Sequence, residues 1–104
     1  HTRGPRTTVK LTDEQVQVGL TRLTGWTRDP DQPVIRRTID LPGFSDAVTL
    51  VNNIARAAEQ ADHHPDIDIR YNKVHLALST HSEGALTEKD MALAARIDEL
   101  ASTH

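Results

Sequence analysis

The sequence predicts an α+β domain, in which an antiparallel sheet of about four strands has three helices packed on one face. Three segments place apolar residues at helical intervals of three and four. Two neighbouring short segments instead alternate apolar and polar residues on either side of a turn. A hairpin is antiparallel and each helix has one apolar face, so the helices are expected to cover one side of the sheet.

The first helix is expected in "LTDEQVQVGLTRLTGW", residues 11–26. Thr12 and Gln15 have the spacing of a capping box, and Gly25 is expected to end the helix. The apolar residues between them recur at helical intervals, at Val16, Leu20 and Leu23. A turn-rich loop, "RDPDQP", then precedes the β-branched strand "VIRRTIDL", with room for a short extra strand around Trp26.

The clearest helix pattern is "FSDAVTLVNNIARAAEQA", residues 44–61. Its apolar residues form one stripe, made of Ala47, Leu50, Val51, Ile54, Ala58 and Ala61. Pro65 cannot continue a helix and biases His64 toward an extended backbone. The helix must therefore end at or just before the adjacent pair of histidines, His63 and His64.

A β-hairpin is predicted next, because apolar residues alternate with polar ones on both sides of Asn72 and Lys73. The apolar positions are Ile67, Ile69 and Tyr71 before the turn and Val74, Leu76 and Leu78 after it. The third helix is expected after the cap candidate Thr87. Its apolar face runs through Met91, Ala94, Ile97 and either Leu100 or Ala101.

Composition excludes several classes of function. The formal net charge is -3, without the basic stripe that nucleic acid demands, so nucleic acid is not expected as a direct partner. The chain has no cysteine, which excludes disulfides and thiolate sites and fits a cytoplasmic location. No apolar run approaches the roughly 20 residues of a membrane span, so we expect a soluble protein without a membrane partner. Residues 1–8 are expected to be a flexible segment and residues 9–104 a single domain.

Histidines gather at the two ends of the predicted hairpin. His63 and His64 lie at the junction between helix and strand, and His81 follows the second strand. The far end of a hairpin's second strand returns beside the start of the first, so the three imidazoles are able to meet. Strict alternation would put His81 on the face of His75, so a bend at the strand end is needed to re-aim it. His75 lies mid-strand and is interpreted as a residue of the sheet surface.

A metal site and an acid–base site are the two functional interpretations of this cluster. Adjacent histidines point in different directions from an extended backbone, and the sequence has no HExxH pattern, so no metal is expected. Acid–base chemistry needs less geometry, because an imidazole with an ordinary pKa of about 6.5 both gives and takes protons near neutral pH.

Two carboxylates accompany the histidines. Glu59 precedes His63 by one helical turn, where it is able to orient an imidazole, although a solvated helix residue is the simpler interpretation. Asp90 follows the cap candidate Thr87 by three residues. There a carboxylate commonly caps backbone amides, which explains Asp90 without any catalytic role.

The combination of "AEQADHHPD", "YNKV" and "LSTH" followed by "GALTEKD" resembles the pterin-4a-carbinolamine dehydratase family, also known as the dimerization cofactor of a homeodomain transcription factor. The resemblance extends from about Leu11 to Leu100. It implies the fold predicted above and an enzyme, a hydro-lyase, that dehydrates 4a-hydroxytetrahydropterin to quinonoid dihydropterin and water. This reaction belongs to the recycling of tetrahydrobiopterin-type cofactors and uses no metal or organic cofactor.

The resemblance also assigns roles by position. It makes three histidines catalytic, namely His63, His64 and His81, and gives them two supporting acids, Glu59 and Asp90. It implies a pterin pocket shaped by Pro65, Thr80 and Ser82. Trp26 matches a tryptophan found early in many members, although as a lone aromatic it is equally suited to the core.

The alternative function is a non-catalytic, dimerising or regulatory module, because the same fold serves the family as the partner of a transcription factor. A metal-dependent hydrolase ranks last. The implied partners are a pterin substrate and further copies of the chain, in a homodimer or homotetramer.

Overall fold

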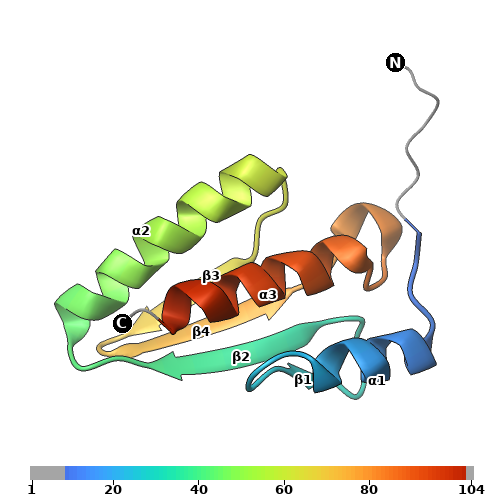
Figure 1. The fold of residues 1–104 in the computed structure, drawn as a ribbon, viewed down its shortest axis with the longest axis horizontal. Coiled ribbons are helices and arrows are strands. Elements are labelled where there is room, and N and C mark those ends of the chain that lie inside the picture. Colours follow the sequence, from blue (N-terminus) through green and yellow to red (C-terminus); the bar gives the residue numbers. More distant parts are fainter. Residues whose placement is uncertain (1–8, 103–104) are drawn as a thin grey trace.

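The computed structural model describes residues 9–102, and the predicted segment 1–8 lies outside these residues, as do His1 and His104. The elements follow the predicted order (Figure 1): α1 (Asp13–Thr21), β1 (Thr27–Arg28), β2 (Ile35–Asp40), α2 (Phe44–Ala61), β3 (Asp66–Arg70), β4 (Lys73–Leu78), the 3₁₀ turn η1 (His81–Glu83) and α3 (Glu88–Ala101). The short strand expected around Trp26 is therefore present as β1.

The sheet has four antiparallel strands in the order β1-β2-β4-β3. The hairpin β3–β4 supplies one half, and β2 pairs along the whole of β4, from Ile35 opposite Leu78 to Asp40 opposite Lys73. Figure 1 shows α2 and α3 lying over the same side of this sheet. The α+β prediction, a four-stranded antiparallel sheet with three helices, is confirmed.

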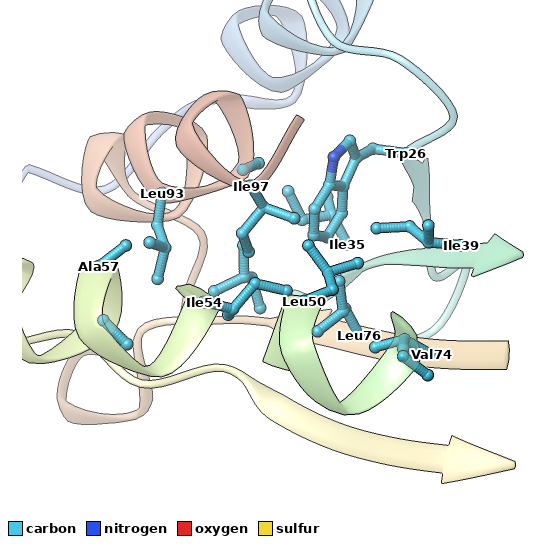
Figure 2. Close-up of a cluster of buried hydrophobic side chains, with 14 of the residues drawn as sticks. Trp26, Ile35, Ile39, Leu50, Ile54, Ala57, Val74, Leu76, Leu93 and Ile97 are labelled. Carbon is cyan, nitrogen blue, oxygen red and sulfur yellow. The ribbon is translucent and has the colours of Figure 1, made fainter. Parts of the chain in front are cut away.

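The core lies between the sheet and the two long helices. Alternate residues of the central strands point toward the helices and are buried, among them Ile35, Ile39, Val74, Leu76 and Leu78. Leu50 and Ile54 of α2 and Ile97 of α3 are fully buried against them (Figure 2). The opposite face of the sheet carries polar residues. His75 is there, as predicted, with its Nδ1 2.8 Å from the hydroxyl of Thr38 on β2.

The first helix ends earlier than predicted. It stops at Thr21 rather than at Gly25, and the Thr21 hydroxyl donates to the Val18 carbonyl at 2.6 Å. A hydroxyl that bonds the backbone in this way competes with helix continuation. The backbone amide of Thr24 is meanwhile held by the Asp98 carboxylate of α3 at 2.9 Å. Gly25 instead takes a left-handed conformation, with φ +77°, in the turn before β1.

The loop between β1 and β2 is built around Asp29. Its carboxylate accepts the backbone amides of Asp31 at 2.8 Å and Gln32 at 3.1 Å, and the Arg36 guanidinium at 3.2 Å. These contacts, the Asp31 amide first, lower the pKa of the Asp29 carboxyl below its ordinary value.

In the described part of the chain, no helix is both long enough and apolar enough to cross a membrane.

Candidate active site

The end of α2 delivers the histidine pair to the sheet. The helix stops at Ala61, and Asp62 turns the chain with a left-handed backbone, φ 50° and ψ 45°. The amide of His63 still reaches the Ala58 carbonyl at 3.1 Å, which fixes its position against the last helical turn. Pro65 is half-buried and leads directly into β3. The predicted end of the helix just before the pair is confirmed.

His63 is buried and paired with a buried carboxylate. Only 8% of the residue is exposed, and its Nε2 lies 2.6 Å from Oδ1 of Asp90, which is fully buried in the first turn of α3. A charged side chain is rarely buried unless it is paired and hydrogen-bonded. The contact joins the end of α2 to the start of α3, between residues 27 positions apart.

Asp90 also has the local role that its spacing predicted. Thr87 is the N-cap of α3, and Oδ2 of Asp90 accepts the Thr87 backbone amide at 3.0 Å, which completes a capping box. One carboxylate therefore caps the helix with Oδ2 and holds an imidazole with Oδ1. The helix cap and the contact with a histidine therefore use different oxygens of Asp90.

Two buried threonine hydroxyls complete this cluster. Thr80 Oγ1 donates to Asp90 Oδ2 at 2.9 Å and lies 2.7 Å from Thr87 Oγ1. The hairpin register points the same way, because Asp66 pairs with Ala77 and His63 and Thr80 each lie three residues beyond that pair. Folding back the hairpin does bring its two ends together, with Asp90 between them.

His64 and Glu59 form a second pair, at the surface. Nε2 of His64 lies 2.6 Å from Oε2 of Glu59, with 58% and 76% of the two side chains exposed. Glu59 thus reaches a histidine, as its place one turn earlier suggested, but the histidine is His64 rather than His63. Exposed pairs of this kind contribute little to stability.

His81 and Ser82 lie in η1, directly after Thr80, and both are exposed. The turn is closed by Gly84, with φ 60°, and by pairing between Thr80 and Ala85. The chain therefore bends directly after β4, at His81. His81 follows Thr80 and His64 follows His63 in the chain, so both exposed imidazoles flank residues of the buried cluster.

Trp26 is placed in the core, away from these residues. It is 5% exposed and lies among Ile35, Leu50 and Ile97 (Figure 2). Its Nε1 donates to Asp98 Oδ1 at 2.8 Å, and the same oxygen binds the Arg37 guanidinium. Of the two interpretations of Trp26, these contacts support the core one.

A cavity of about 330 Å³ opens beside His63, between α2 and α3. Three small side chains line this cavity, those of Ala57, Ala61 and Ala92. Its polar lining residues are His63, Gln60, Lys89 and Arg96. No group of three or more histidine or acidic side chains among residues 9–102 is arranged to hold a metal ion.

The residue that sequence reasoning missed is Thr87. Its position marked a helix cap, but its buried hydroxyl also contacts Thr80, seven residues earlier in the chain. The capping-box spacing of Thr87 and Asp90 was the available signal, because it places both side chains at one end of α3. The resemblance implies that Thr80 shapes a pterin pocket. The structure adds that its hydroxyl donates to Asp90.

Known proteins resemble this chain in sequence and in fold. The model of a family described as pterin 4 alpha carbinolamine dehydratase matches residues 9–100. Two bacterial relatives provisionally named pterin-4-alpha-carbinolamine dehydratases are similar. The protein from Roseiflexus castenholzii is 53% identical over 86% of this chain and 95% of its own, and that from Nocardia farcinica is 52% identical over 91% and 98%.

Two solved structures share the fold. A Brucella melitensis protein described as a transcriptional coactivator/pterin dehydratase has a TM-score of 0.87 and 33% identity, and covers 89% of this chain and 99% of its own. A pterin dehydratase-like protein described as a RuBisCO assembly factor in the alpha-carboxysome has a TM-score of 0.65 and 23% identity, over 74% and 89%. This second likeness shows the fold alone. By its sequence over residues 9–100, the chain belongs to the pterin-4a-carbinolamine dehydratase family of hydro-lyases.

Proposed function

We propose that this protein dehydrates 4a-hydroxytetrahydropterin to quinonoid dihydropterin by histidine acid–base catalysis. The C4a–O bond breaks and the hydroxyl leaves as water after taking a proton from an acid. A base removes the proton from N5, and a double bond forms between C4a and N5. The protein needs to supply one proton donor and one proton acceptor, held on either side of the pterin.

The observation that carries this proposal is the buried pair of His63 and Asp90. An imidazole held by a carboxylate has a fixed orientation, and the carboxylate stabilises the imidazolium that forms when a proton arrives. Proton transfer by a positioned side chain contributes about 10²–10⁴-fold to a rate. The small cavity beside His63 leaves this imidazole within reach of a small molecule.

The exposed imidazoles complete the proposed site. His81, in the turn after the hairpin, and His64, held by Glu59, are the candidates for the group that works opposite His63. Backbone groups near Thr80 and Ser82, with Pro65, would bind the planar pterin. Trp26 is left out, because it packs in the core and its indole nitrogen is already bonded.

An assay that follows the loss of 4a-hydroxytetrahydropterin tests the proposal. A variant with both His63→Ala and His81→Ala should lose the protein-dependent part of the rate. His75→Gln is the matched control, because His75 lies on the other face of the sheet, and this variant should keep it. Unchanged turnover in the double variant would rule out the assignment of these histidines.

A binding or regulatory role is the second candidate. The Brucella melitensis protein is described by both activities, coactivator and dehydratase, so the two are not exclusive there. The buried His63–Asp90 pair favours the enzyme, because a scaffold does not require a carboxylate to orient an imidazole. A pterin-binding titration combined with capture of partners separates the two. A specific protein partner without pterin binding would favour the regulatory role, whether or not the chain forms dimers or tetramers.

A further inference from the structure

We infer that the buried cluster around Asp90 fixes the tautomer of His63, so that this imidazole takes the N5 proton at Nδ1, with Thr80 and Thr87 as positioning residues. The inference deepens the proposed function, since it assigns the acceptor of the N5 proton to one atom. It rests on four residues that are all buried, His63, Asp90, Thr80 and Thr87.

The hydrogen bonds of the cluster run in one direction. Thr87 Oγ1 accepts the amide of Lys89 at 3.3 Å and lies 2.7 Å from Thr80 Oγ1. The Thr80 hydroxyl then donates to Asp90 Oδ2 at 2.9 Å. A hydroxyl has one proton to give, and that of Thr80 goes to Asp90, so Thr80 Oγ1 accepts in its contact with Thr87 and the Thr87 hydroxyl is the donor.

This direction assigns the protons at the imidazole. Oδ2 of Asp90 accepts two donors, the Thr80 hydroxyl and the Thr87 amide, and so carries no proton of its own. An imidazole is a stronger base than a carboxylate, so the proton between Oδ1 and Nε2 is assigned to Nε2 of His63, which is the donor. A neutral imidazole with its proton on Nε2 has its lone pair on Nδ1.

The remaining nitrogen is reachable from outside. Every buried side-chain nitrogen or oxygen among residues 9–102 has a hydrogen-bond partner, yet Nδ1 of His63 has none in the described part of the chain. Nδ1 is therefore the nitrogen of His63 that is left to meet a ligand, on a residue that is 8% exposed. His63 also lines the cavity between α2 and α3.

The chemistry follows from this assignment. Neutral His63 accepts the N5 proton at Nδ1, and the resulting imidazolium keeps its Nε2 hydrogen bond to the Asp90 carboxylate. The leaving hydroxyl then takes its proton from a different group, with His81 and His64 as the two imidazoles available. Thr80 and Thr87 contact Asp90 or one another rather than the imidazole, so they act only through the carboxylate.

The variant Asp90→Asn tests the direction of the cluster without removing its shape. The two donors from Thr80 and Thr87 would require the carbonyl oxygen of the new amide in the place of Oδ2. Its NH₂ group would then face His63 and donate to Nε2, which moves the imidazole proton to Nδ1. The helix cap is retained, because the same carbonyl still accepts the Thr87 amide.

Nitrogen-15 NMR of histidine-labelled protein reads the tautomer directly, with the His63 signals assigned by their loss in His63→Gln. We expect a proton on Nε2 in the wild-type protein and on Nδ1 in Asp90→Asn, with kcat reduced about 10²–10⁴-fold. Thr87→Val should give a mixture of tautomers and a lower kcat at unchanged KM, whereas Thr87→Ser should restore both. A proton on Nδ1 in the wild-type protein, or the same tautomer in Asp90→Asn, would overturn the inference. The NMR measurement needs no substrate, so a wild-type protein without dehydratase activity would refute the proposed function separately.

Discussion

Replacing Asp98 by alanine should destabilise the protein more than any change to its exposed ion pairs. Asp98 is the acceptor of three donors from the opposite end of the chain, which are the Thr24 amide, the Trp26 indole and the Arg37 guanidinium. The side chains of Arg37 and Asp98 are each 15% exposed. Asp98→Ala leaves all three donors without this acceptor in a place where water has little access.

The size of the effect follows from this burial. An orphaned buried donor costs about 1–3 kcal/mol, and breaking a fully buried ion pair costs about 3–5 kcal/mol. Because water still reaches part of the Arg37 side chain, we expect a total loss of about 2–4 kcal/mol in the free energy of unfolding. For a domain of this size, that corresponds to a fall of about 10–25 °C in Tm.

Urea denaturation followed by the fluorescence of Trp26, the only tryptophan of the chain, measures this loss. The matched control is Asp40→Ala, which removes the exposed partner of Lys73 and should cost less than about 0.5 kcal/mol. A loss in Asp98→Ala no larger than that of the control would refute the structural role given to Trp26, Arg37 and Asp98.

Two further variants test the core and the turn before β1 by the same denaturation experiment. Ile54→Ala, at a fully buried position of α2, should cost about 2–5 kcal/mol, and a loss below 1 kcal/mol would mean that the core is not packed as described. Gly25→Ala should cost about 1–2 kcal/mol, because the residue has φ +77° and its new Cβ would lie 3.2 Å from Arg37 Nε. Unchanged stability there would contradict the left-handed turn.

Local signals in the sequence predicted much of the fold. The capping boxes at Thr12 and Thr87 each involve residues three apart, and Pro65 limits α2 whatever the rest of the chain does. The alternation on both sides of Asn72 likewise predicted the hairpin, but its turn lies at Tyr71 and Asn72 rather than at Asn72 and Lys73. The inner face was predicted for β4, whereas Ile67 and Tyr71 are exposed. These features depend on neighbours in the chain, so the amino-acid pattern alone contains them.

Contacts between distant residues could not be predicted in this way. Helix α1 ends at Thr21, and just beyond it the Thr24 amide binds Asp98, 74 positions away in the chain. The local pattern does not contain this contact, so it predicts the end of the helix too late, at Gly25. The pairing of His63 with Asp90 depends on how the end of α2 meets the start of α3. The spacing of Asp90 from Thr87 predicted a helix cap, and the family resemblance placed Asp90 among the supporting acids.

The rate of loss of 4a-hydroxytetrahydropterin, with and without a catalytic amount of the purified protein, tests the central claim most directly. The account predicts that the wild-type protein accelerates this loss through many turnovers and that His63→Gln abolishes most of the acceleration. A wild-type rate equal to that of the protein-free solution, or an undiminished rate in His63→Gln, would contradict it.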